Sequence, residues 1–361
     1  MRGLRKYLTP FAPDQSGAVS VLFELGGIVV ICDAGGCTGN VCGFDEPRWF
    51  EQKSAIFSAG LRDMDAILGR DDRLVAKLAD VVQKIDATFV AVIGTPVPAV
   101  IATDYLALKR MSEKKIKLPI LTVDTDGMEL YDKGEEKAFL ELFKIFAIEK
   151  YQPEEDRIGI LGMTPQDVSD LKAADKMREL FQQKYDQQAV CYGMGDGLEE
   201  IKKASSASKN IVVSPAALVA AQYLEKTFGT PYEISYPLAG ELIPEMDYTG
   251  KKILVVHQQV IANSIRKELL KKGAKRVQIA SWFMMKPELR KDTDLHLRDE
   301  DDYINLVEKE AYDVIYADPC MKRMTPKFDG NFIDTIHFAV SGHLAEARGS
   351  EAVSYTHLRD H

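Results

Sequence analysis

The sequence has neither a long apolar run nor an excess of positive charge. Although 46% of its 361 residues are hydrophobic, no stretch of about 18 consecutive apolar residues occurs, so it offers no membrane-spanning helix. Polar residues, rather than the apolar core of a secretory signal, follow the basic N-terminus. The net charge of −9 argues against nucleic acid as the main partner. We therefore expect a cytoplasmic protein with no nucleic-acid and no membrane partner.

Cysteine is also scarce, and its distribution is uneven. Of five cysteines, three fall within residues 32–42, while Cys191 and Cys320 stand alone. Five thiols in a cytoplasmic chain are poor evidence for disulfides. The cluster of three favours metal or redox chemistry, whereas Cys191 lies in an apolar run and is expected in the core.

Short apolar runs alternate with amphipathic stretches along the chain. Nearly all-apolar runs are typical of parallel strands that are buried on both faces. We predict an α/β fold of three Rossmann-like modules with mainly parallel sheets and helices on both faces. The expected strands are residues 27–32, 89–94, 119–123, 157–162, 189–193, 210–214, 253–257, 277–281 and 314–317. The clearest expected helices are residues 72–86, 135–149 and 264–272.

Two polar breaks, at residues 149–156 and 241–252, divide the chain. They predict an N-terminal module over residues 1–150 with the cysteine segment, a second over 151–245 and a third over 246–350. Residues 353–361 resemble a peptide that arises when sequencing-adapter DNA is translated. We therefore expect residues 351–361 to be a non-native tail and the third module to be truncated.

Several chemically reactive residues follow predicted strands. They are Cys32, Cys37, Thr95, Ser214, Asp318 and Cys320. In open α/β sheets ligands bind at the carboxyl ends of strands, so these positions are candidates for a site.

The cysteines at 32, 37 and 42 have the spacing C-x4-C-x4-C in a segment with four glycines. Thiolates are the usual protein ligands of iron–sulfur clusters, and glycines allow a bulky group to approach the backbone. Three thiols are one short of a four-cysteine set, so a fourth ligand must come from elsewhere. The alternative is that Cys32 ends a buried strand while Cys37 and Cys42 are incidental loop thiols.

Residues 10–18 (PFAPDQSGA) and Gly35-Gly-Cys37 resemble the N-terminal region of nitrogenase component 1 subunits, especially the β-type chain. In this family two turns supply the first and second ligands of a cluster. Cys37 falls on the second ligand, and Asp14 stands where the family has the first cysteine. The related light-independent protochlorophyllide reductase uses an Asp as a ligand, so Asp14 is a candidate; the alternative is a loop carboxylate or helix cap.

The resemblance continues through residues 58–74, 89–104 and 119–127 and then becomes vague. The turn that carries the family's third cysteine is here Thr95-Pro96-Val97-Pro98, without a cysteine. Ser214 stands where α-type subunits hold the iron–molybdenum cofactor with a Cys, which argues against that standard cofactor. Ser341-Gly342-His343 is a weak echo of the cofactor's His turn, and His337 is expected to be structural.

The resemblance implies an oxidoreductase subunit with a [4Fe–4S]-type cluster, held by Cys37 with Cys32, Cys42 and Asp14; Cys320 and His343 are weaker candidates. It implies a homologous component 1-like subunit, or a second copy, as partner. It also implies an ATP-hydrolysing iron protein as electron donor, in an anaerobic setting. Two alternatives stay open: a cluster-assembly scaffold of the same family, and a metal-free small-molecule binding protein. The substrate does not follow from the sequence.

Overall fold

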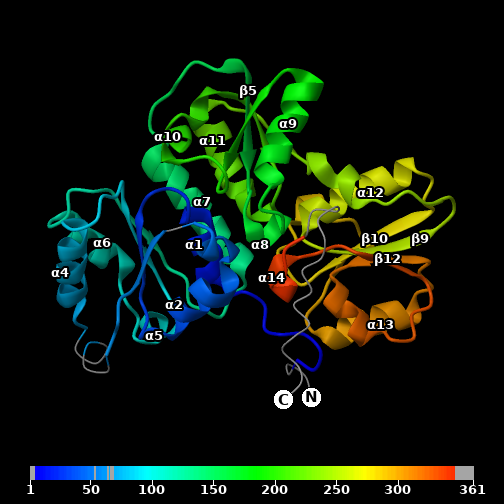
Figure 1. The fold of residues 1–361 in the computed structure, drawn as a ribbon, viewed down its shortest axis with the longest axis horizontal. Coiled ribbons are helices and arrows are strands. Elements are labelled where there is room, and N and C mark those ends of the chain that lie inside the picture. Colours follow the sequence, from blue (N-terminus) through cyan, green and yellow to red (C-terminus); the bar gives the residue numbers. More distant parts are fainter. Residues whose placement is uncertain (1–4, 53, 63–64, 66–68, 346–361) are drawn as a thin grey trace.

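Three parallel sheets, one after another along the chain, form the framework of the protein (Figure 1). The computed structural model describes residues 5–52, 54–62, 65 and 69–345. The expected tail at 351–361 and residues 63–64 and 66–68 of the family-like segment lie outside the described residues. None of the helices in the described ranges is both long enough and apolar enough to span a membrane.

The first sheet has the strand order β2-β1-β3-β4, and all neighbouring strands are parallel. Its strands are β1 (Ile28–Ile31), β2 (Ala55–Ser58), β3 (Val90–Ile93) and β4 (Ile120–Val123). Its helices are α1 (Asp14–Leu22), α2 (Gly36–Asn40), α4 (Asp71–Val82), α5 (Pro96–Val100) and α6 (Tyr105–Glu113). The central strands β1 and β3 are buried along their whole length, as their unbroken Val and Ile content predicts.

The second sheet has the order β6-β5-β7-β8, and the third has the order β11-β10-β9-β12-β13. The second contains β5 (Glu154–Leu161), β6 (Gln188–Tyr192), β7 (Ala207–Val212) and β8 (Tyr232–Ile234), with α8 (Pro165–Val168), α9 (Ala173–Tyr185), α10 (Leu198–Lys202) and α11 (Leu218–Phe228). The third contains β9 (Lys252–Val256), β10 (Arg276–Ser281), β11 (Leu295–His296), β12 (Val314–Ala317) and β13 (Asn331–Asp334), with α12 (Gln259–Lys271), α13 (Glu300–Lys309) and α14 (Phe338–Ser341).

Helix α7 (Tyr131–Phe146) lies between the first and second sheets and belongs to the core of both. Its Phe143 ring meets Tyr192 of β6 edge-on, with ring centroids 5.4 Å apart. Its other side packs tightly on α1, because a Cβ at Gly134 would lie 1.7 Å from the Asp14 carbonyl oxygen. Burial of this helix on two sides therefore joins the first two sheets into one hydrophobic core.

The N-terminal segment crosses to the third sheet. Leu8 and Phe11 are buried there, and the Phe11 ring lies 5.6 Å from Trp282 and 5.2 Å from Phe283. The Glu300 carboxylate accepts hydrogen bonds from the backbone N–H groups of residues 6, 7 and 8. The start of the chain thus ties the first sheet to the third.

The predicted α/β class with three parallel sheets is confirmed, and each strand expected from the sequence is present. The structure adds the strands β2, β8, β11 and β13, all at sheet edges. The breaks expected near residues 150 and 245 fall between sheets, but the division into three independent modules stays a prediction.

Candidate functional site

The cysteine loop, residues 33–45, leaves β1 at the carboxyl edge of the first sheet. Asp33 anchors it: its carboxylate accepts hydrogen bonds from the Thr38 N–H (2.8 Å), the Thr38 hydroxyl (2.9 Å) and the Ser58 hydroxyl (2.6 Å). The first bond satisfies a backbone N–H in the first turn of α2, and the last ties the loop to the end of β2. The chain then continues as a π-helical turn over Val41–Asp45, a rare conformation that occurs often at functional sites.

The three cysteines of the segment do not share one environment. Cys32 is 2% exposed and continues the alternation of β1, so it packs with Val30 and Leu78 on the face that α4 covers. Cys37 and Cys42 are half-buried and pack against the core on the other face of the sheet, which contains Val41. The structure therefore brings Cys37 and Cys42 to one side and places Cys32 on the other.

Burial disfavours the thiolate form of all three thiols. Burial raises the pKa of Cys32 to about 12, with further contributions from the Asp71 and Asp33 carboxylates. Burial also raises the pKa of Cys37, against an opposing hydrogen bond with the Thr95 hydroxyl, and the pKa of Cys42, with help from Glu46. A metal that binds these sulfurs must displace their protons.

Asp14 lies at the start of α1 and is 1% exposed. Its Oδ1 accepts hydrogen bonds from the Gln15 and Gly127 N–H groups, both at 2.8 Å, and its Oδ2 accepts one from Asp126 N–H at 2.9 Å. Burial raises the pKa of Asp14 to about 6, although these three hydrogen bonds lower it. In this structure the Asp14 carboxylate fixes the turn after β4 through its hydrogen bonds with Asp126 and Gly127.

The family-like turns meet at this edge of the sheet. Gly127, at φ +72°, packs so tightly that a Cβ there would lie 2.4 Å from Pro96 Cδ. Next to it, the buried Gln15 Oε1 has no hydrogen-bond partner among the described residues. Asp14, Pro96 and the turn after β4 therefore lie close together, and the Thr95 hydroxyl donates a hydrogen bond to the Cys32 carbonyl at 2.6 Å.

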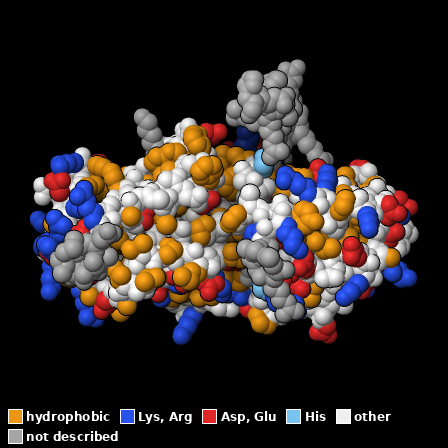
Figure 2. All heavy atoms as spheres, turned by 90° about the horizontal axis from the view of Figure 1, so that it is seen from below, with side chains coloured by type: hydrophobic (Ala, Val, Ile, Leu, Met, Phe, Trp, Pro, Cys, Tyr) orange, Lys and Arg blue, Asp and Glu red, His pale blue; other side chains and the backbone are white. Residues whose placement is uncertain are grey.

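The surface around the cysteine loop is apolar. Phe44, Val97, Val100 and Met128, here called the apolar rim, are 75%, 40%, 76% and 74% exposed. Figure 2, which views this end of the molecule from below, shows hydrophobic side chains spread over its left and middle parts. Apolar side chains that are exposed on one face are candidates for a contact surface.

The comparisons with known proteins identify the family. Residues 14–240, more than half of the chain, match the family model of the nitrogenase component 1 type oxidoreductases. The chain belongs to this family. No curated protein matches it.

Two solved structures share the nitrogenase component 1 fold with this chain. Nitrogenase Cp1 at pH 6.5 aligns with a TM-score of 0.71 at 12% identity, over 93% of this chain and 87% of that one. Nitrogenase Cp1 at pH 5 aligns with a TM-score of 0.67 at 15% identity, over 93% and 85% of the two chains. These likenesses show the shared fold and no more.

The positions that resemble the nitrogenase cofactor ligands carry different chemistry here. Ser214 is fully buried, and its hydroxyl accepts a hydrogen bond from the Ala216 N–H at 3.1 Å, so it caps the short helix that follows.

His343 lies exposed beyond α14. Cys320 is half-buried after β12, and burial beside Asp318 raises the pKa of its thiol. Cys191 is buried in β6, as expected. Within the described part of the chain, no three His, Cys, Asp or Glu side chains are placed to hold a metal ion.

A buried polar cluster at the junction of the three sheets escaped the sequence analysis. Tyr131 donates a hydrogen bond to Asp167 Oδ1 at 2.6 Å and lies 3.0 Å from His337 Nε2. The Thr164 hydroxyl donates to Glu135 Oε1 at 2.6 Å. Burial raises the pKa of Asp167 to about 6, although its hydrogen-bond partners lower it. Burial and the Asp167 charge raise the pKa of Glu135 well above its ordinary value, so Glu135 retains its proton. In the sequence, the position of Thr164 just after β5 was the one feature that could have pointed to this cluster.

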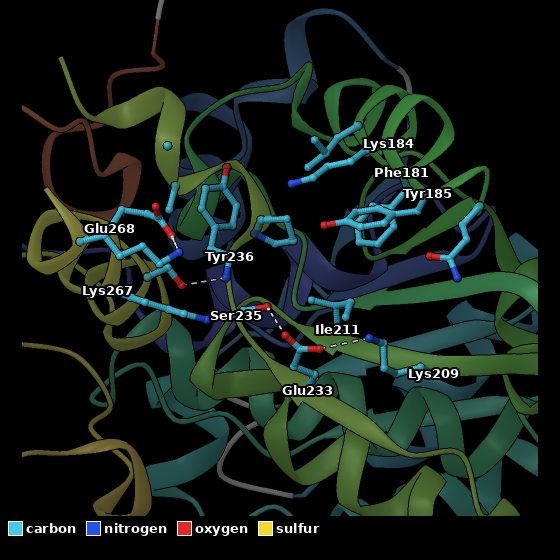
Figure 3. A pocket seen from close by; sticks show the side chains of 17 residues that line it. Phe181, Lys184, Tyr185, Lys209, Ile211, Glu233, Ser235, Tyr236, Lys267 and Glu268 are labelled. Carbon is cyan, nitrogen blue, oxygen red and sulfur yellow. Dashed lines mark hydrogen bonds and ion pairs between the residues drawn. The ribbon is translucent and has the colours of Figure 1, made fainter. Parts of the chain in front are cut away.

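A lysine-lined cavity of about 520 Å³ lies between α9, β8 and α12 (Figure 3). Two of its four lysines have carboxylate partners: Lys209 pairs with Glu233 at 3.1 Å, and Lys271 pairs with Glu268 at 2.7 Å. The cavity extends from Gln187, which precedes β6, to Ser235 and Tyr236, which follow β8. Because two of its lysines already have carboxylate partners, this cavity is a weak candidate.

Proposed function

We propose that this chain is a subunit of a nitrogenase-like oxidoreductase that holds an iron–sulfur cluster, of the [4Fe–4S] type, at the cysteine loop. In this proposal a separate ATP-hydrolysing iron protein supplies the electrons, and the complex passes them to a substrate. Family membership supports the reaction type, and the local structure of the loop supports the position of the cluster.

The observation that carries the proposal is the placement of the glycines beside Cys37 and Cys42. Among the described residues, no atom outside the local helix lies within 4 Å of the position that a Cβ would take at Gly36, Gly39 or Gly43. Each glycine in a helical segment costs about 1 kcal/mol relative to alanine, and packing within this chain does not require these three. Close approach of a group from outside the chain explains them.

Cys37 and Cys42 are the ligands that we propose first, because both thiols lie half-buried on the same side of the sheet. Cys32 and Asp14 were predicted with them, but Cys32 faces the opposite core and Asp14 is engaged by three N–H groups. Two thiols form half of a four-ligand set, so a second chain would complete the site. The unpartnered Gln15 Oε1 nearby is a further polar group that a completed site could use.

When bound, an iron–sulfur cluster supplies one-electron transfer, and the protein tunes its potential through hydrogen bonds and burial. In this chain Asp33 would hold the loop in place through Thr38 and Ser58. The half-buried setting of Cys37 and Cys42 would limit access of water.

The partner that we propose is a homologous component 1-like subunit or a second copy of this chain, seated on the apolar rim. Phe44 belongs to the cysteine loop, and Val97 and Met128 adjoin Pro96 and Gly127, which pack against each other. In this proposal one contact covers these exposed side chains and completes the ligand set. Because Ser214 lacks a thiol and its hydroxyl is already engaged, we propose that the standard iron–molybdenum cofactor is not bound.

Anaerobic purification followed by iron and sulfide analysis and electron paramagnetic resonance tests the proposal. We expect Cys37→Ala and Cys42→Ala each to remove most of the iron. Cys320→Ala is the matched control, since this half-buried thiol lies beyond β12, and Cys32→Ala should also retain iron. Full iron retention in both loop variants, or a protein without iron after anaerobic reconstitution, would overturn the proposal and favour a metal-free binding protein.

A cluster-assembly scaffold is the second candidate, and Ser214 at the cofactor position favours it as much as it favours a different reductase. Both candidates predict bound iron. Electron uptake from an iron protein with ATP, measured as bleaching of the cluster absorbance, followed by reoxidation when substrate is added, is expected only of the reductase.

A further inference from the structure

The buried carboxyl groups of Glu135 and Asp167 each have one oxygen without a fixed donor. Thr164 donates to Glu135 Oε1 and Tyr131 donates to Asp167 Oδ1, both at 2.6 Å. Within the described part of the chain, Glu135 Oε2 and Asp167 Oδ2 have no such partner. Glu135 is fully buried and Asp167 is 1% exposed, so bulk solvent does not reach these two oxygens. A buried carboxylate oxygen without a donor is costly, so the two oxygens need an explanation.

One shared proton satisfies both oxygens. The two side chains are hydrogen-bonded to each other, and a hydrogen bond between two carboxyl groups requires a proton on one of them. Glu135 carries this proton, because burial and the Asp167 charge raise its pKa. Asp167 is the acceptor, because hydrogen bonds from Ser214 and Tyr131 favour its ionised form. The pair is therefore one carboxylic acid and one carboxylate in a fixed geometry.

The pair can accept a second proton, on Asp167. Burial raises the pKa of Asp167 to about 6, so this carboxylate is ionised at neutral pH but protonates just below it. The titratable groups that face the pair are Tyr131, Asp132 and, beyond Tyr131, His337. Asp132 adds negative charge, and burial keeps His337 neutral by lowering its pKa. A further negative charge nearby would therefore protonate Asp167 at neutral pH.

Helix α8 connects the pair to the cysteine loop. Gln166, the neighbour of Asp167 in this helix, donates a hydrogen bond from Nε2 to the carbonyl of Asp45, the last residue of the loop. The Asp45 carboxylate accepts a hydrogen bond from Asn40 at 2.6 Å. Asn40 lies between the two cysteines that we propose as ligands. One hydrogen-bonded segment thus runs from the cysteines to the residue beside Asp167.

The pair and the loop also share an apolar core. Cys37 and Cys42 pack against this core, and Phe139, one turn after Glu135 in α7, belongs to it. Charges interact more strongly across an apolar core than through water. An electron that enters at the cysteine loop therefore raises the proton affinity of Asp167.

We propose that the Glu135–Asp167 pair is a proton-loading site, in which Asp167 takes up a proton when an electron enters at the cysteine loop. The iron protein supplies the electron and solvent supplies the proton, so the Asp167 carboxylate becomes a carboxylic acid and the core gains no net charge. Addition of hydrogen to a substrate consumes one proton per electron, and this site stores such a proton. The inference rests on the proposed function, because the electron is held by the proposed cluster.

Infrared spectroscopy of the full chain tests the shared proton and does not require iron. We expect a C=O band of a protonated carboxyl group at neutral pH that shifts in D2O. Glu135→Gln should remove this band, because glutamine keeps a donor for Asp167 but has no acid proton. Glu141→Gln, on the surface of the same helix, is the matched control and should retain it. Spectra that are identical in the parent and in Glu135→Gln would overturn the shared proton.

Redox titration of the iron-loaded protein tests the second proton. Reduction near neutral pH, followed with a pH-indicator dye, should take up protons in the parent and in Glu141→Gln. Asp167→Asn should lose this uptake. The reduction potential of the parent should fall as the pH rises above about 6, whereas that of Asp167→Asn should stay nearly constant. Equal uptake and equal slopes in the parent and in Asp167→Asn would overturn the proton-loading site.

Tyr131→Phe provides a second variant if Asp167→Asn does not fold. It removes a donor from the ionised form of Asp167 and should therefore shift the start of the potential slope to higher pH. A residue with a structural role only would not move this pH. An unchanged profile in Tyr131→Phe would contradict the assignment to Asp167.

The proton-loading site and the proposed function can fail separately. Normal iron content with unchanged proton uptake in Asp167→Asn overturns the proton-loading site alone. A protein without iron after anaerobic reconstitution overturns the proposed function and with it the uptake coupled to reduction. The infrared band still decides in that case whether Glu135 and Asp167 share a proton.

Discussion

His257 and His337 stack face to face, with ring centroids 4.2 Å apart and an interplanar angle of 8°. His257 follows β9, and His337 precedes α14. His257 Nδ1 accepts the Gln258 N–H at 2.9 Å, and its Nε2 donates to the Ile336 carbonyl at 3.1 Å, so the ring is neutral. Two stacked rings at this separation cannot both carry a charge without strong repulsion.

Stability should rise between about pH 4 and pH 6.5 because of this stack. Burial lowers the pKa of His257 to about 4 and the pKa of His337 well below its ordinary value. The unfolded chain binds these protons near pH 6.5, so acid favours the unfolded state. His257 alone would contribute up to about 3 kcal/mol over this range. Chemical denaturation at several pH values measures it.

His257→Asn keeps an acceptor for the Gln258 N–H and removes the titrating ring. Its free energy of unfolding should therefore depend less steeply on pH below about 6.5. His343→Asn is the matched control because His343 is exposed. An unchanged slope in His257→Asn would contradict the assignment of the acid sensitivity to the stack.

Glu135 should destabilise the protein as the pH rises. Burial and the nearby Asp167 raise the pKa of Glu135 well above its ordinary value of 4.5, so the folded state retains a proton that the unfolded state releases. Stability is therefore lost as pH increases above about 4.5. Glu135→Gln imitates the protonated form and should become progressively more stable than the parent at higher pH. Glu141→Gln, on the surface of the same helix, should show no such trend; a constant difference for Glu135→Gln would contradict the prediction.

Arg48 holds the first and second sheets together. It is 2% exposed, makes a double hydrogen bond to Glu46, pairs with Glu24 at 2.9 Å and donates to the Gly193 carbonyl. Arg48→Met leaves the buried Glu46 carboxylate without its cation and should cost about 3–5 kcal/mol in urea denaturation. Arg298→Met, which removes an exposed ion pair with Asp302, should have little effect. A small loss in Arg48→Met would show that the pair is not needed for docking.

Two groups of glycines should respond oppositely to alanine. Gly134→Ala forces a Cβ against the Asp14 carbonyl, and Gly17→Ala forces one to 1.9 Å from the Tyr131 carbonyl, so both should destabilise the α1–α7 contact by at least about 2–3 kcal/mol. Gly39→Ala meets no atom and should leave thermal stability unchanged or slightly raised. We expect Gly39→Ala nevertheless to lower iron content or partner binding; normal values for both would remove the argument drawn from the open glycines.

The central strands could be predicted from the sequence because they are buried on both faces and therefore continuously apolar. The four strands that were missed, β2, β8, β11 and β13, lie at sheet edges and have half-exposed, mixed sequences. Such strands exist because a neighbouring strand offers hydrogen bonds, and that neighbour is distant in the sequence. Helix α7 begins four residues before the expected 135, since Tyr131 and Asp132 are buried by the third sheet rather than by a local pattern.

The sequence by itself determined the α/β class, the family and the cysteine loop as the place to look, since each depends on local patterns or short motifs. Only the tertiary structure decided which thiols lie on the same side. Side chains alternate between the two faces of the sheet along β1, so Cys32 faces the core that contains Val30. The helical turns after Gly35 place Cys37 and Cys42 against the core on the opposite face, which contains Val41. The Tyr131, Asp167 and His337 cluster also required the fold, because Asp167 lies 36 positions and His337 206 positions after Tyr131 in the chain.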